Sequence, residues 1–161
     1  VINSFSKYFS MTGWRIGWMV VPENHIRQVE RLAQNMFICA PHSSQIAALG
    51  ALSSVKELRQ NLEIYKIKGE LLIDGLKKAG FDKFAPPDGA FYVYADISQF
   101  SSDSLSFCKS MLEKAGVAIT PGLDFDSTRG KQTIRFSYAC TTDEIKEGIK
   151  RIVKFMYKYK E

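Results

Sequence analysis

One long run of regularly spaced apolar residues limits most strongly how this chain can fold. Apolar or small residues recur at alternating steps of four and three, at Leu58, Leu62, Tyr65, Gly69, Leu72, Leu76 and Ala79. This spacing keeps one face of an α-helix apolar for about six turns. The sequence therefore predicts a helix over about 55–79, ended by Gly80, because glycine is favourable just after a helix C-terminus.

The part before this helix is predicted to contain a strand and two shorter helices. The apolar run 16–21 stops at Pro22 and has the composition of a buried strand. Helices are expected over about 24–37 and 44–53. Residues 1–3 have the pattern of a strand that is already under way, so we expect the sequence to be a fragment of a longer protein.

The part after the long helix is predicted to be a compact α+β unit. Strands are expected over 89–95, 117–120 and 133–138, and helices over about 103–115 and 142–159. With 161 residues, the chain is long enough to bury a real hydrophobic core.

Composition excludes several classes of function. The net charge is +5, from 22 basic and 17 acidic residues, and the excess lies mainly in the last helix. There the basic residues are spaced like the solvated side of an amphipathic helix, without interleaved aromatics, which argues against nucleic-acid binding. No apolar run approaches the roughly 18 residues of a membrane span, and the N-terminus lacks a signal-peptide pattern.

Cysteine and histidine usage argues against a metal or disulfide framework. Cys39, Cys108 and Cys140 are odd in number and lack CxxC spacing, which is typical of reduced thiols in a cytoplasmic protein. His25 and His42 have no cysteine or acid at metal-ligand spacing. No metal site is therefore expected.

A lysine surrounded by aromatic residues lies near the start of the chain. Lys7 follows Phe5 and precedes Tyr8 and Phe9, so we expect a partly dry setting for its amine. A lysine amine can serve as a nucleophile toward a carbonyl or as a general base. Taken alone, however, such a lysine is more often an ordinary surface residue.

Groups suited to an anion flank this lysine. The hydroxyls of Ser4 and Ser6 can donate hydrogen bonds. Arg15, framed by glycines and tryptophans, offers a planar fork that matches a phosphate. Lysine, hydroxyls and arginine together favour a ligand that carries both an aldehyde and a phosphate.

The same residues resemble a known family. Ser4-Phe5-Ser6-Lys7 and Met11-Thr12-Gly13-Trp14-Arg15-Ile16-Gly17 are similar to the cofactor-lysine segment of fold-type I pyridoxal-phosphate (PLP) enzymes, and more narrowly of class I/II aminotransferases. The resemblance implies that Lys7 holds PLP as a Schiff base. It also implies that Ser4 and Arg15 bind the cofactor phosphate, with Ser6 as a further cofactor-binding residue.

The resemblance also implies a fold. The chain would be α/β, the C-terminal part of the PLP-dependent transferase fold: the end of the large cofactor domain, a long linking helix and a small α+β domain. We place the boundary inside the helix near Gly69, giving domains 1–68 and 69–161.

Arg135 is the second anchor of the functional prediction. It lies in a strand-like run where its side chain should leave the opposite face from Ile134 and Phe136. An arginine there needs an anionic partner, and a carboxylate fits its fork. The run Arg135-Phe136-Ser137-Tyr138-Ala139 resembles the family strand that binds the substrate α-carboxylate; a structural ion pair is the alternative.

Two further segments resemble the surroundings of the family's active site. In Pro87-Asp88-Gly89-Ala90-Phe91-Tyr92, Phe91 is either a substrate-pocket residue or an ordinary core aromatic. The loop Thr120-Pro121-Gly122-Leu123-Asp124-Phe125 is expected to shape the site entrance without taking part in chemistry.

The implied function is amino-group transfer between an L-amino acid and a 2-oxo acid by a ping-pong mechanism. The resemblance implies a homodimer, and the cysteine usage indicates a cytoplasmic location. We expect the isolated fragment to be inactive because other cofactor contacts would precede Val1. Two alternatives stay open: a PLP-dependent carbon–sulfur β-lyase, and an aminotransferase-like effector domain of a transcription regulator.

Overall fold

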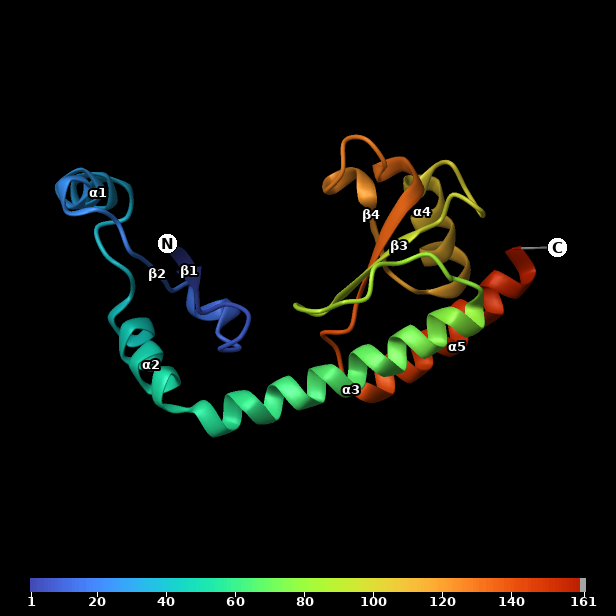
Figure 1. The fold of residues 1–161 in the computed structure, drawn as a ribbon, viewed down its shortest axis with the longest axis horizontal. Helices are drawn as coiled ribbons and strands as arrows, with labels where there is room; N and C mark the ends of the chain where they lie inside the picture. Colours follow the sequence, from blue (N-terminus) through green and yellow to red (C-terminus); the bar gives the residue numbers. More distant parts are fainter. Residues whose placement is uncertain (160–161) are drawn as a thin grey trace. The chain divides into compact units, whose positions relative to one another are not determined.

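The computed structural model describes residues 1–159, whose path is drawn in Figure 1. They form two compact units that divide within one helix, between Leu62 and Glu63. Each unit has its own hydrophobic core. None of the helices in this described part is both long and apolar enough to cross a membrane.

The first unit is built from a two-stranded sheet and helices. Its elements are β1 (Ile2–Ser4), a 3₁₀ turn (Thr12–Trp14), β2 (Gly17–Met19), α1 (Glu23–Met36), α2 (His42–Ser53) and the start of α3 (Val55–Ala79). The helices agree with the predicted ranges. Its core is small, with Phe5, Met11 and Ala48 buried together.

The expectation of a buried strand over 16–21 is wrong for this chain. β2 pairs with β1 in antiparallel register, but all three residues of β2 are exposed. Within residues 1–159, β1 is the only strand paired with β2. An apolar run therefore does not by itself specify burial, because β2 is left exposed by the rest of residues 1–159.

The second unit is the predicted α+β unit. Its elements after α3 are β3 (Tyr92–Asp96), α4 (Ser104–Ala115), β4 (Thr120–Pro121), two 3₁₀ turns (Gly122–Asp124 and Gly130–Gln132), β5 (Thr133–Ser137) and α5 (Thr142–Tyr159). The strands form an antiparallel sheet in the order β3-β5-β4.

Two strands are shorter than predicted, and each has a local reason. The first begins only at Tyr92, because Ala90 has a left-handed φ of 58° that interrupts an extended backbone. The edge strand consists of Thr120 and Pro121, the two residues that pair with β5, so only Thr120 of the predicted range 117–120 lies in it. Both corrections concern strand ends, where pairing partners decide the boundary.

One face of this sheet carries the core of the second unit. Val93 and Ala95 of β3 and Ile134 and Phe136 of β5 are buried. Helices α3, α4 and α5 each contribute side chains to the same cluster, including Leu76, Phe107, Met111 and Met156. Full burial of each large apolar side chain stabilises the fold by about 1.5–3 kcal/mol. The opposite face is left for polar residues.

Helix ends follow the signals in the sequence. Gly80 has a φ of 94°, and the amide of Phe81 donates to the Leu76 carbonyl at 3.0 Å, which closes the end of α3. Asp103 caps α4 by accepting from the amides of Leu105 and Ser106. Hydrogen bonds from the Ser106 hydroxyl and amide lower the pKa of the Asp103 carboxyl.

Gly75→Ala is expected to destabilise the second unit, although alanine normally favours a helix by about 1 kcal/mol over glycine. A Cβ at position 75 would lie 2.6–2.7 Å from three side-chain atoms of Ile149, a stiff β-branched residue on α5. Overpacking of this kind costs about 1–3 kcal/mol. Urea unfolding should show the net loss.

Gly148→Ala is the matched control for that substitution. It lies in α5 of the same unit, and a Cβ there would have no atom within 4 Å. We expect it to stabilise the unit by about 0.5–1 kcal/mol. Equal urea-unfolding midpoints for the Gly75→Ala and Gly148→Ala variants would contradict the close packing of α3 against α5.

Thiol chemistry gives an independent check of the core. Burial raises the pKa of the Cys108 thiol to about 11, while Cys39 and Cys140 are exposed. Because the thiolate is the reactive form, a disulfide reagent at pH 8 should modify Cys39 and Cys140 about 100-fold faster than Cys108. All three should react in urea; equal rates in the native chain would contradict this packing.

Candidate active site

The segment around Lys7 is a tight loop between β1 and β2. Ser4 faces Gly17 across the two strands, and the amide of Phe5 donates to the Ile16 carbonyl at 3.2 Å. The buried side chains of Phe5 and Met11 anchor the loop to the small core. A Cβ at Gly17 would lie only 2.7 Å from the Asn3 carbonyl, so this crossing needs a glycine.

The predicted phosphate donors gather on this loop. The hydroxyls of Ser4 and Ser6 lie 2.9 Å apart, and Ser4 Oγ also accepts from the Ser6 amide. Thr12 Oγ1 donates to the Ser6 carbonyl at 2.6 Å, and Arg15 Nη1 donates to the Thr12 carbonyl at 2.9 Å. Extending the β1–β2 register by two residues would pair Ser6 with Arg15, so both donors lie on the same end of this loop.

The charge of this loop suits a phosphate. No acidic residue occurs before Glu23, so no carboxylate from residues 1–22 competes for the guanidinium of Arg15. Arg15 is exposed and has a left-handed φ of 52°, a backbone angle uncommon for arginine. Two hydroxyls and one guanidinium are hydrogen-bond donors, and such a set of donors fits the phosphate of PLP.

Lys7 is exposed, and the expectation of a partly dry setting is wrong for this chain. The neighbouring rings explain why. Phe5 and Phe9 pack on each other with centroids 4.5 Å apart, and Tyr8 contacts the edge of Phe9 at 5.2 Å. These rings therefore fill the small core or pack on one another, and the lysine side chain is left accessible.

Arg135 lies on the polar face of the three-stranded sheet, as its sequence position predicts. Ile134 and Phe136 on either side of it are buried in the core, while Arg135 is half-buried. Its neighbours across the sheet are Tyr94 on β3 and Thr120 on β4. The strand alternation thus separates one cationic side chain from the apolar layer beneath it.

The guanidinium of Arg135 is held by aromatic rings and not by an acid. Its central carbon lies 4.2 Å from the ring centre of Tyr92 and 4.3 Å from that of Phe125. Its Nε is buried and has no hydrogen-bond partner among the described residues. No ion pair to Arg135 is present among residues 1–159, so the alternative of a structural ion pair gains no support.

A guanidinium that lies between two aromatic rings and is not paired with an acid of the described residues is suited to bind a carboxylate. Stacking on aromatic faces restrains the plane of the guanidinium. A buried donor without a partner costs about 1–3 kcal/mol, which an arriving anion would recover. The second unit thus presents an oriented fork that no acid of the described residues engages.

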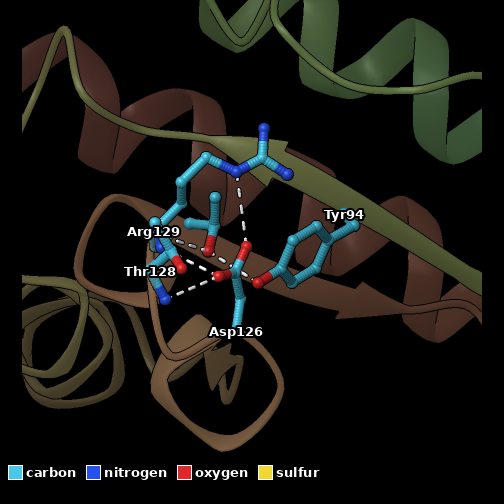
Figure 2. Close-up of polar contacts among 5 residues, drawn as sticks. Tyr94, Asp126, Thr128 and Arg129 are labelled. Carbon is cyan, nitrogen blue, oxygen red and sulfur yellow. Dashed lines mark hydrogen bonds and ion pairs between the residues drawn. The ribbon is translucent and has the colours of Figure 1, made fainter.

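A polar network fixes the loop that carries Phe125. Figure 2 shows the Asp126 carboxylate accepting from the amides of Thr128 and Arg129, both at 2.8 Å, and from Arg129 Nε at 3.3 Å. These contacts, the Arg129 amide first, lower the pKa of Asp126. Asp126 is therefore already satisfied as an acceptor, although it adjoins Phe125.

Close packing of the same loop requires Gly122. A Cβ there would collide with Thr133 Oγ1 and lie 2.7 Å from Tyr94 Oη. Thr133 Oγ1 donates to the Arg129 carbonyl, so the Tyr94 hydroxyl is the donor in its 2.6 Å contact with Thr133. Gly122 lets the loop approach the sheet closely enough for Phe125 to reach Arg135.

Phe91 lies at the edge of the core. Its ring stacks on Tyr65 of α3 at 5.7 Å and packs on Tyr92 at 4.5 Å. Its carbonyl accepts from the Tyr138 amide, and the Tyr138 hydroxyl donates to the Ala90 carbonyl. Burial raises the pKa of Tyr138, which keeps that donor protonated. Phe91 packs on Tyr92, whose ring in turn contacts Arg135, and the role of Phe91 in substrate binding stays a prediction.

Comparison with known proteins supplies the family. The sequence model of the family "Aminotransferase class I and II" matches residues 1–152. The chain belongs to the class I and II aminotransferases. The predicted family and fold class are thereby confirmed, and the division into domains near Gly69 stays a prediction.

Relatives of this aminotransferase chain are found among curated proteins and solved structures. It is 51% identical over 154 residues to the valine–pyruvate aminotransferase of Mycobacterium tuberculosis, covering 94% of this chain and 40% of that protein. A crystal structure of a Silicibacter pomeroyi protein assigned as an aminotransferase is 63% identical with a TM-score of 0.91 over 98% of this chain and 43% of that one. A Thermus thermophilus aspartate aminotransferase variant is 32% identical with a TM-score of 0.84, over 96% and 42% of the respective chains.

The chain therefore spans about two fifths of the aminotransferases it matches. The residues predicted from sequence fall into both units: Ser4, Ser6, Lys7 and Arg15 share one loop of the first, and Arg135 and Phe91 belong to the second.

Sequence reasoning missed the two rings that orient Arg135. Tyr92 could have been found, because it alternates with buried Val93 and so shares the Arg135 face. Phe125 could not, because it comes from an irregular loop.

Proposed function

We propose that the parent protein is a PLP-dependent aminotransferase that moves an amino group between an L-amino acid and a 2-oxo acid. The observation that carries this proposal is the loop of Lys7, where a lysine amine, two hydroxyls and the Arg15 guanidinium occur without a carboxylate from residues 1–22. Membership of the aminotransferase family supports the same reading.

Each residue of the loop has a defined role in the proposal. Ser4, Ser6 and Arg15 bind the cofactor phosphate through hydroxyl and guanidinium donors. The Lys7 amine would hold the cofactor by condensing with its aldehyde with loss of water, and as a free amine it would move a proton at the substrate α-carbon, first as base and then as acid. When bound, PLP supplies the electron sink for the carbanion.

Arg135 has the complementary role for the substrate. Its fork binds the α-carboxylate through two parallel hydrogen bonds. Tyr92 and Phe125 keep the guanidinium plane in place before the substrate arrives. Such preorganisation lowers the entropy lost on binding.

The assembly and division of the parent protein are part of the proposal. Residues 1–68 would complete a large cofactor domain and residues 69–161 a small domain, joined by α3. The homodimer and the cytoplasmic location inferred from the sequence stay predictions, as does the inactivity of the isolated fragment.

The decisive experiment uses the parent protein with PLP, a panel of L-amino acids and a 2-oxo acid acceptor. We expect a new amino acid to form in step with loss of the donor. Release of pyruvate and a thiol from cystathionine, without any acceptor, would instead establish the β-lyase. Saturable binding of an amino acid without turnover would favour the regulator.

A further inference from the structure

A hollow lies in the second unit between the end of α4 and the later turns of α5, and the proposed function makes no use of it. Its volume is about 400 Å³. Four cationic side chains line it: Lys114 of α4 and Arg151, Lys154 and Lys158 of α5. No acidic side chain of the described residues is part of the lining. The basic residues of α5 are thus not only a solvated helix face.

The spacing of these cations is unfavourable for the helix by itself. Arg151, Lys154 and Lys158 follow at steps of three and four, which places like charges side by side on α5. Each such pair costs an isolated helix about 0.2–0.5 kcal/mol. An anion that binds all three would remove the repulsion.

The charge left after internal compensation is positive. Glu147 accepts from Arg151 Nε at 2.9 Å and so offsets one of the four charges. The C-terminus of α4 carries about half a negative charge, which offsets part of another. The hollow therefore keeps about two to three positive charges, which a phosphomonoester near pH 7 would largely neutralise.

Aromatic surface adjoins the cations. Phe155 and Tyr159 line the same hollow, with ring centres 5.3 Å apart and planes inclined by 33°. Tyr159 is 38% exposed, whereas Phe155 is buried. A ligand with a planar apolar group would cover the exposed ring, and the volume suits a small molecule.

We propose that this hollow binds a phosphomonoester that carries an aromatic group. Lys114, Lys154 and Lys158, with the free side of the Arg151 guanidinium, hold the dianion. Tyr159 packs against the organic group. The site is separate from the loop of Lys7, with which it shares no residue.

The test is a titration of the isotope-labelled 161-residue chain with phenyl phosphate, followed by amide chemical shifts. We expect shifts at Lys114, Lys154 and Tyr159, and binding about fivefold tighter than that of inorganic phosphate because the ring adds apolar contact. The double variant Lys154→Gln/Lys158→Gln should weaken binding about tenfold.

Lys146→Gln/Lys150→Gln is the matched control, since it removes two charges from α5 outside the lining. It should change the affinity less than twofold. Equal weakening by both double variants would overturn the proposal in favour of attraction to net charge. Shifts confined to Ser4, Ser6 and Arg15 would also overturn it, while leaving the proposed cofactor role of that loop intact.

Discussion

Lys7→Ala is expected to abolish amino transfer in the parent protein, with a loss of at least about 10³-fold. The substitution removes both the nucleophile for the cofactor aldehyde and the group that moves the α-proton, and acid–base catalysis alone contributes about 10²–10⁴-fold. Lys7 is exposed on a loop whose anchors are Phe5 and Met11. Its removal should therefore leave the fold unchanged.

The measurement combines covalent labelling with kinetics. Borohydride reduction of the parent protein with PLP should place one stable label on Lys7 and none on Lys7→Ala. Lys7→Arg keeps the charge but cannot form the bond, so it should also be inactive. Lys56→Ala, an exposed lysine on α3, is the control and should keep wild-type activity. Full transfer by Lys7→Ala would refute the assignment.

Regular elements were predictable from this sequence wherever one face is buried within the chain itself. The predicted face of α3 is buried at Leu58, Leu72, Leu76 and Ala79, but Leu62 is 53% exposed. The alternation around Arg135 appears as expected. The apolar run of β2 followed the same rules, and its predicted burial was nevertheless wrong. An apolar pattern indicates which side chains favour burial. It does not indicate which other residues, if any, bury them.

The candidate site was predictable in its charged residues and less so in what orients them. Lys7 and Arg135 could be named as candidates because their residue types and motifs carry chemistry, and their roles stay predictions. Phe125 was not, because its contact with Arg135 depends on the approach of a loop that Gly122 permits and Asp126 fixes. Such contacts are set by tertiary packing and leave no period in the sequence.

The second large effect is expected from Arg135→Gln, which should raise the KM of the parent protein for its amino acid and lower kcat/KM by about 10²-fold or more. A bidentate carboxylate contact comprises two charged hydrogen bonds, each contributing about 1.5–3 kcal/mol. Arg135→Lys keeps the charge but loses the fork, so its effect should be intermediate. Labelling of Lys7 should persist in both variants, because Arg135 has no role in binding the cofactor.

Stability separates this binding role from a structural one. If Arg135 served the fold, its loss would destabilise the second unit; Nε is instead buried without a hydrogen-bond partner among the described residues. The substitution has two opposing effects on the free energy of unfolding. Removing the unsatisfied Nε donor stabilises the fold by about 1–3 kcal/mol, and losing the stacking on Tyr92 and Phe125 destabilises it. Thermal unfolding of Arg135→Gln should therefore match wild type.

Lys131→Gln removes one exposed charge of the same unit and should leave both KM and stability unchanged. A KM for Arg135→Gln within twofold of wild type would contradict the carboxylate role. A marked drop in its unfolding temperature would assign the arginine to the fold. An arginine that no acid within residues 1–159 pairs with, and that two rings hold flat, is suited to a ligand that arrives from solvent.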